Sequence, residues 1–122
     1  FFITAPDNMD ITDQILSSKD YIILMISKKL AEADKHELQK GFDLGEFCLR
    51  NNIGFYVVTA SGIDEINAYL NDLTICQGDE TTLKTILRAN PGYMLLKEGT
   101  IKDKWSWANL PEEDELLELL NK

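Results

Sequence analysis

Two cysteines are the side chains of this sequence best suited to redox or nucleophilic chemistry. Cys48 falls on the apolar side of a predicted helix, where a cysteine ordinarily serves as a small core residue. Cys76 ends a short predicted strand before Gln77-Gly78, where a partly exposed, reactive thiol is the alternative to a structural role. The spacing of the two cysteines neither supports nor excludes a disulfide between them.

The sequence lacks the residue patterns that a metal site or a phosphate-binding site requires. His36 is the single histidine and opens a predicted helix, where we expect a solvated surface residue. One histidine with two separated cysteines does not make a zinc site, and the sequence has no Gly-rich phosphate loop or Ser-centred nucleophile elbow. The acidic run Glu112–Glu115 is typical of a solvated helix start rather than a calcium loop. We therefore predict no catalytic residue, no metal and no small-molecule cofactor.

The composition limits the class of partner. The 122 residues include 12 Lys and Arg against 21 Asp and Glu, which gives a net charge of −9 and a pI of about 4.5. Such a chain lacks the basic surface that binds nucleic acid or an anionic membrane. With 44% hydrophobic residues it can build the core of one domain, which we expect to span residues 1–122. No apolar run approaches the ~20 residues of a membrane-spanning helix.

Two apolar runs predict the centre of a sheet. Tyr21–Ile26 and Phe55–Thr59 are rich in β-branched residues, and such runs suit strands that are covered on both faces. Between them, Asp34 and Glu37 form the capping-box pattern that begins a helix. The apolar side of that helix comprises Leu38, Phe42, Gly45, Cys48 and Leu49.

The other expected elements are shorter. Gly41 and Gly45 lie four residues apart on one side of the long helix, which indicates a close approach to the sheet. Ser61 is expected to cap the next helix. The helix after Ser61 should turn Ile63, Ile66, Tyr69 and Leu70 inward. The other expected elements are a strand at Phe1–Thr4, a helix ending near Leu16, an extended piece at Leu73–Cys76 and a helix after Gly78-Asp79. A last helix starts at Leu110-Pro111 and buries Leu116, Leu117, Leu119 and Leu120.

The segment from Asn90 to Trp105 predicts a β-hairpin that is entered through a proline. Pro91 has no backbone N–H and therefore belongs at the start of a strand. The apolar strand Tyr93–Leu96 is followed by the turn Lys97-Glu98-Gly99, whose glycine can adopt a positive φ. Thr100–Trp105 is the return strand.

The order of these elements predicts the fold class. Strands and helices alternate in the first half, and parallel connections require helices that cover the sheet. We predict an α/β fold, a three-layer α/β/α sandwich with a central mixed sheet of about five strands and helices on both faces. Tyr21–Ile26 should lie between Phe55–Thr59 and Tyr93–Leu96.

The second half of the chain resembles a thioredoxin-like domain. The features that carry the resemblance are a helix running into Asn90-Pro91, an apolar strand, a charged Gly turn and a return strand. The resemblance implies a cis Asn90–Pro91 bond that faces the region used as the active site in redox-active members. Those members carry Cys-x-x-Cys at the start of the helix after the central strand, where the helix dipole and the paired thiol lower the pKa of the attacking cysteine. Here that place is Lys28–His36, which contains no cysteine.

A narrower resemblance is to the C-terminal thioredoxin-like domain of Bacteroidetes membrane proteins of the DoxX type. It implies that the domain follows transmembrane helices in a longer, membrane-anchored chain, and we expect the domain on the periplasmic side. The matching residues are Leu83–Gly92, Leu95–Ile101, Lys104-Trp105, Asp10-Ile11-Thr12, Glu32-Ala33-Asp34 and Thr59-Ala60-Ser61-Gly62.

Three functional interpretations follow. The first is a non-catalytic thioredoxin-like domain that acts as a peptide-binding, protein-binding or regulatory module of a membrane protein, with its own membrane region among the candidate partners. The alternative is a domain related to thiol–disulfide oxidoreductases that uses Cys76 or cysteines in the missing part of the chain. The third is a purely structural domain.

We expect a partner to bind where the parallel strands end, because ligands of open α/β sheets gather there. Lys28 and Lys29 favour an extended segment with some negative charge, although two lysines could equally keep an exposed loop soluble. Trp105 and Trp107 share strand parity, which predicts core packing, with a binding surface as the alternative. The expected binding residues are Lys28, Lys29, Ala60, Ser61, Asn90 and Pro91, within the loops Lys28–Asp34, Ala60–Gly62 and Asn90-Pro91.

Overall fold

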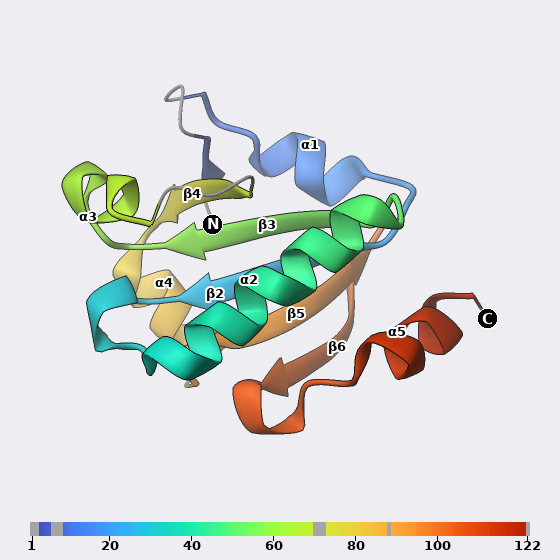
Figure 1. Ribbon diagram of the computed structural model, residues 1–122. Coiled ribbons are helices and arrows are strands. Elements are labelled where there is room, and N and C mark those ends of the chain that lie inside the picture. The colour runs from blue at the N-terminus through green and yellow to red at the C-terminus, as the bar shows by residue number, and fades with distance from the viewer. Residues whose placement is uncertain (1–2, 6–8, 70–72, 88, 122) are drawn as a thin grey trace.

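A single mixed sheet with helices on both faces forms the structure, a computed structural model that describes residues 3–5, 9–69, 73–87 and 89–121 (Figure 1). The described part of the sheet has six strands in the order β1-β4-β3-β2-β5-β6, one more than the approximate number predicted. The strands are β1 (Ile3–Thr4), β2 (Ile22–Ser27), β3 (Gly54–Thr59), β4 (Thr74–Gly78), β5 (Gly92–Lys97) and β6 (Thr100–Ser106).

Strand β2 is the centre of the sheet, as its sequence predicts. All six of its residues are buried, and it pairs in parallel with β3 and antiparallel with β5. β4 continues the parallel half beside β3, β1 pairs antiparallel with β4, and β6 pairs antiparallel with β5. The predicted strand at Phe1–Thr4 is present as Ile3–Thr4, and its first two residues lie outside the described ranges.

Alternate residues of the strands supply two separate hydrophobic clusters, one on each face of the sheet. The first cluster includes Met25 and Tyr93 and packs against α2 and α5, whereas the second includes Leu24 and Met94 and packs against α1 and α4. No helix of the described residues is long and apolar enough to span a membrane. The helices are α1 (Thr12–Ser17), α2 (Lys35–Arg50), α3 (Ile63–Asn67), α4 (Glu80–Ile86) and α5 (Glu113–Leu120), with the 3-10 turns η1 (Leu30–Glu32) and η2 (Trp107–Asn109).

Helix α2 begins where its capping pattern predicts. Asp34 is its N-cap, and the carboxylate accepts a hydrogen bond from the Glu37 N–H at 3.1 Å. Gly45 allows the close approach to the sheet, because a Cβ atom there would lie 2.7 Å from carbon atoms of Leu73 and Phe55. Leu49 was predicted on the buried side but is 46% exposed, because the helix turns it away from the sheet.

Two other helices differ from the prediction. α3 has Gly62 as its N-cap, and Ile63 is 50% exposed instead of facing inward, whereas Leu70 lies outside the described residues. The last helix begins at Glu113 and not at Leu110-Pro111. Leu116 is fully buried in it, and Leu117, Leu119 and Leu120 pack against the core while remaining partly exposed.

The hairpin has the predicted form. Asn90–Pro91 is a cis peptide bond, and β5 follows directly from Gly92. Two residues of the turn have positive φ, Glu98 at 52° and Gly99 at 76°, and they connect β5 to β6. The register shifts between Leu95 and Leu96, where Lys102 of β6 is left unopposed.

We expect Gly45→Ala to lower the free energy of unfolding by about 1–2 kcal/mol, because the added methyl group would overpack the contact with Leu73 and Phe55. The better helix propensity of alanine offsets only part of this cost. Urea denaturation measures the change. Glu46→Ala, an exposed position on the same helix, should stay within about 0.5 kcal/mol of the wild type, and equal stability of the two variants would contradict the prediction.

Candidate functional site

Three loops meet at the end of the sheet where β2 and β3 finish. They are the loop after β2, the loop after β3 and the proline loop that leads into β5. The backbone N–H of Ala60 donates a hydrogen bond to the carbonyl of Lys28 at 3.1 Å, which joins the first two loops. The structure therefore brings together the residues that were expected to form a binding surface: Lys28, Lys29, Ala60, Ser61, Asn90 and Pro91.

The side chain of Asn90 joins the proline loop to the end of β2. The hydroxyl of Ser27 donates to Asn90 Oδ1 at 2.6 Å, and Asn90 Nδ2 donates to the carbonyl of Lys29 at 3.0 Å. Ser27 is fully buried at the last position of the central strand. Asn90 thus fixes the position of the proline relative to the loop that occupies the usual active-site place.

Ser61 has a different role from the helix cap that was predicted. Its Oγ accepts a hydrogen bond from the buried N–H of Leu30 at 2.9 Å and a second from the hydroxyl of Thr59 at 3.1 Å. The Ser61 N–H in turn donates to Thr59 Oγ1 at 3.1 Å. Because Ser61 and Thr59 are both buried, they position the two loops, and Gly62 takes the cap position.

Sequence reasoning missed three residues of this network. Ser27 was placed in the polar connection after the first apolar run and Thr59 at the end of the second, and neither was predicted to join the loops. Each is the polar residue that follows or ends an apolar run, and such a residue must find a hydrogen-bond partner when buried. Glu65 of α3 accepts a hydrogen bond from the Ala31 N–H at 2.6 Å, and no local pattern signalled it because the two residues lie 34 positions apart.

The loops leave a partly open surface. Lys28, Lys29, Ala60 and Asn90 are half-buried, and Pro91 is buried beneath them. The loop after β2 is fixed on both sides, by Asn90 and by the Ser61 hydroxyl. The outer face of this loop carries the half-buried Lys28 and Lys29 at its start and the exposed side chains of Ala31, Glu32 and Asp34 further along.

Neither cysteine lies at this surface. Cys48 is fully buried on α2, and burial, with a smaller contribution from Glu113, raises the pKa of its thiol to about 12. Cys76 is also fully buried, and burial raises the pKa of its thiol to about 12, so the partly exposed, reactive thiol considered from the sequence is wrong. The two thiols are free and belong to the clusters on opposite faces of the sheet.

Other groups with chemical potential are few in the described part of the chain. His36 is exposed at the start of α2, as predicted, and no group of three or more His, Cys, Asp or Glu side chains among the described residues is arranged to hold a metal. Tyr93 is fully buried, and its hydroxyl has no hydrogen-bond partner among the described residues. Burial, and to a lesser extent Glu37, raises the pKa of Tyr93, so its hydroxyl stays neutral.

We expect Ser61→Ala to lower the free energy of unfolding by about 1–3 kcal/mol, because the buried N–H of Leu30 would lose its acceptor. Urea denaturation measures this change. Ser18→Ala is the matched control, since Ser18 is only partly buried and its bonds with Asp20 are exposed and long, at 3.3 and 3.4 Å. A cost for Ser61→Ala no larger than that of the control would show that the bond does not hold the loops.

We also expect both thiols of the folded domain to react slowly with Ellman's reagent at about pH 8, at least about a hundredfold more slowly than in concentrated guanidinium chloride, because the thiolate is the reacting form. Their raised pKa values also mean that the unfolded thiols lose protons first. Stability should therefore fall as the pH rises from the ordinary thiol pKa of 9.0 towards 12. Rapid labelling of the folded protein that disappears in Cys76→Ala would contradict the burial of that thiol.

Comparison with known proteins identifies the fold through structures alone. No family model matches the sequence, and no curated protein sequence matches it. The N-terminal domain of PilB from Neisseria gonorrhoeae is 14% identical with a TM-score of 0.67, and the match covers 98% of this chain and 87% of that one. A thio-disulfide isomerase from Thermus thermophilus is 12% identical with a TM-score of 0.71, covering 99% and 89% of the two chains.

A third solved structure agrees with these two. The dsbF protein of MTB, solved in mixed oxidised and reduced forms, is 14% identical with a TM-score of 0.70, and the match covers 99% of this chain and 92% of that one. Identities this low establish the fold and not the activity. The strand order, the proline before β5 and these structural matches show that the chain has a thioredoxin-like fold.

Proposed function

We propose that this domain is a non-catalytic member of the fold that binds an extended peptide or protein segment at the surface formed by Lys28–Asp34, Ala60–Gly62 and Asn90-Pro91. The observation that carries the proposal is that the proline loop is anchored to the central strand through Asn90, whereas both thiols are buried elsewhere. The domain thus keeps the geometry of a binding surface without the reacting groups.

The proposal that the domain does not catalyse thiol–disulfide exchange rests on the residues at the start of α2. Thiol–disulfide exchange requires an accessible thiolate, which a helix N-terminus stabilises. Here that position is held by Asp34, whose carboxylate already accepts the Glu37 N–H and so satisfies part of the helix end. The alternative enzyme that uses Cys76 would have to expose a thiol that is fully buried in β4 and has a pKa near 12.

The charge of the surface suggests the chemistry of the segment. Lys28 and Lys29 stand side by side on the loop in a chain whose net charge is −9. Each is half-buried, and the exposed carboxylates of Glu32 and Asp34 follow on the same loop, so the positive charge is confined to the start of the loop. We propose that the bound segment is extended and carries negative charge, which would steer it to this end of the molecule.

We further propose that the domain serves a membrane protein, with the domain on the periplasmic side and the membrane-proximal part of the same protein as its partner. The support for this is the resemblance of Leu83–Gly92, Leu95–Ile101 and Lys104-Trp105 to the C-terminal domain of DoxX-type proteins. Regulation by strand addition beside a proline loop would need no cofactor.

The test is an NMR titration of the 15N-labelled domain with an acidic, extended peptide and with the same peptide in which Ser replaces each acidic residue. We expect shifts for Lys28–Asp34, Ala60–Gly62 and Asn90 with the acidic peptide. Lys28→Ser combined with Lys29→Ser should weaken binding about tenfold, roughly the effect of losing two exposed charge contacts. Lys102→Ser, an exposed lysine of the hairpin, should leave the affinity unchanged.

Two outcomes would contradict the proposal. Shifts confined to the opposite end, at Asn51–Gly54 and Glu98–Thr100, would place binding elsewhere. Reduction of insulin by dithiothreitol at a thioredoxin-like rate in the presence of the domain would show that it is catalytic. The expected insulin result is the uncatalysed rate, both for the wild type and for the variant with Cys48→Ala and Cys76→Ala.

A further inference from the structure

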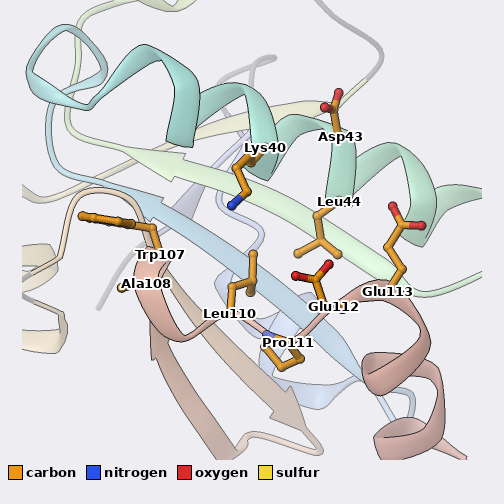
Figure 2. Close-up of a pocket in the computed structure, with 9 residues that line it drawn as sticks. All are labelled: Lys40, Asp43, Leu44, Trp107, Ala108, Leu110, Pro111, Glu112 and Glu113. Atoms are coloured by element: carbon orange, nitrogen blue, oxygen red, sulfur yellow. The ribbon is translucent and has the colours of Figure 1, made fainter.

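A second candidate surface lies between α2 and the connection from β6 to α5. A cavity of about 260 Å³ opens there, lined on the α2 side by Lys40, Asp43 and Leu44 (Figure 2). The other wall is the segment from Trp107 to Glu113. Because Gly92 of β5 pairs with Ser106 of β6, this connection starts at the same end of the sheet as the proline loop.

One end of the cavity is an exposed tryptophan. Trp105 and Trp107 were predicted to share a face of the strand, but β6 ends at Ser106 and Trp107 belongs to η2. Trp105 packs against the core, whereas Trp107 is 42% exposed. Tryptophan is enriched among the residues that contribute most to binding at protein interfaces.

The opposite part of the cavity carries a carboxylate without an internal partner. Glu112 is the N-cap residue of α5, but its side chain makes no capping hydrogen bond. That carboxylate belongs to an exposed residue and makes no hydrogen bond or ion pair with the described residues, so water is what a ligand would replace. Figure 2 shows the Glu112 carboxylate turned into the cavity, beside Leu44 and Pro111.

A cation of the protein itself already points into this space. The side chain of Lys40 extends from α2 into the cavity (Figure 2). Its ammonium group pairs with Glu37 at 3.8 Å, and the Lys40 side chain is 55% exposed. An ion pair of this kind contributes little to stability, so Lys40 can move out of the cavity at small cost.

We propose that this cavity receives a lysine or arginine side chain from a basic peptide segment. The aliphatic stem of such a side chain would lie on Leu44, Leu110 and Pro111, and its charged head would reach the Glu112 carboxylate. Trp107, at the other end of the cavity, offers an aromatic face on which the guanidinium of a neighbouring arginine of the same segment stacks. Lys40 is the internal cation that the incoming side chain displaces.

The charges around the cavity fit this ligand better than an anion. Asp43, Glu112 and Glu113 line it together with a single lysine, Lys40. The first turn of α5 adds Asp114 and Glu115, so the potential around the opening is negative. The site is therefore distinct in charge from the surface at Lys28 and Lys29, and it does not depend on the function proposed for that surface.

The experiment is an NMR titration of the domain with a blocked octapeptide of alternating Arg and Ser, and with the same peptide carrying Glu in place of Arg. We expect the Arg peptide to shift the indole N–H of Trp107 and the backbone signals of Lys40, Leu44 and Glu112. Glu112→Gln and Trp107→Ala should each weaken binding at least about fivefold. Lys40→Gln should strengthen binding, because it removes the competing cation.

Two control variants match these changes. Glu46→Gln removes one exposed carboxylate of α2 outside the cavity, and Ile101→Ala truncates a side chain that is 49% exposed on the hairpin. Neither control should change the affinity for the Arg peptide. Dispersed amide spectra confirm that each variant is folded.

Several results would overturn the proposal. If the domain bound the Glu peptide more tightly than the Arg peptide, or if Lys40→Gln weakened binding of the Arg peptide, the cavity would not be a site for cationic side chains. An equal effect of Glu112→Gln and Glu46→Gln would show that only the net charge matters. The Lys28 and Lys29 variants leave this cavity intact, so loss of Arg-peptide binding in them would also contradict it.

Discussion

The structure depends on the burial of β2 between a parallel and an antiparallel neighbour. All six residues of Ile22–Ser27 are buried, and their side chains alternate between the two hydrophobic clusters. A strand in this position needs helices on both faces, because each face buries apolar side chains. Its parallel pairing with β3 also places the loops after both strands at one end of the sheet. The antiparallel pairing with β5 brings the start of β5, and so Pro91, to the same end.

The same burial explains why the loops at that end are held so firmly. Ser27 and Thr59 end the two central strands, and each hydroxyl is buried with no access to water. A buried hydroxyl without a partner costs stability, so the loops are arranged to supply Asn90 and Ser61 as partners. The surface is thus a consequence of how the central strands end. In this chain it exists without the cysteine pair that redox-active members of the fold place on it.

The sequence predicted most of the fold because its strongest signals are local. The apolar runs at β2 and β3, the Asp34 cap and the glycine turn after β5 all have direct physical causes within a few residues. It failed where burial depends on the three-dimensional environment. Leu49 and Ile63 follow an apolar pattern but face solvent. Cys76 was predicted to end a strand, but it lies in the middle of β4 and is fully buried. Trp107 was predicted to pack like Trp105 because strand parity was extended beyond the predicted end of the strand, whereas β6 ends at Ser106 and Trp107 belongs to η2.

For the candidate site, the sequence predicted which loops lie close together but not the hydrogen bonds that hold them. The rule that ligands gather at the ends of parallel strands was sufficient to bring Lys28, Ala60 and Asn90 together. It could not show that Ser61 is a buried positioning residue, because that role depends on hydrogen bonds to Leu30 and Thr59.

The charges at this end of the molecule place a constraint on any partner. The loop after β2 carries two lysines at its start and two exposed carboxylates, Glu32 and Asp34, further along, whereas three carboxylates and one lysine line the cavity beside Trp107. The pairing of Gly92 with Ser106 puts these two surfaces at one end of the sheet. A segment of uniform charge would be attracted to one of them and repelled by the other. A single segment that contacts both must therefore change the sign of its charge along its length, which is a more specific requirement than either surface imposes alone.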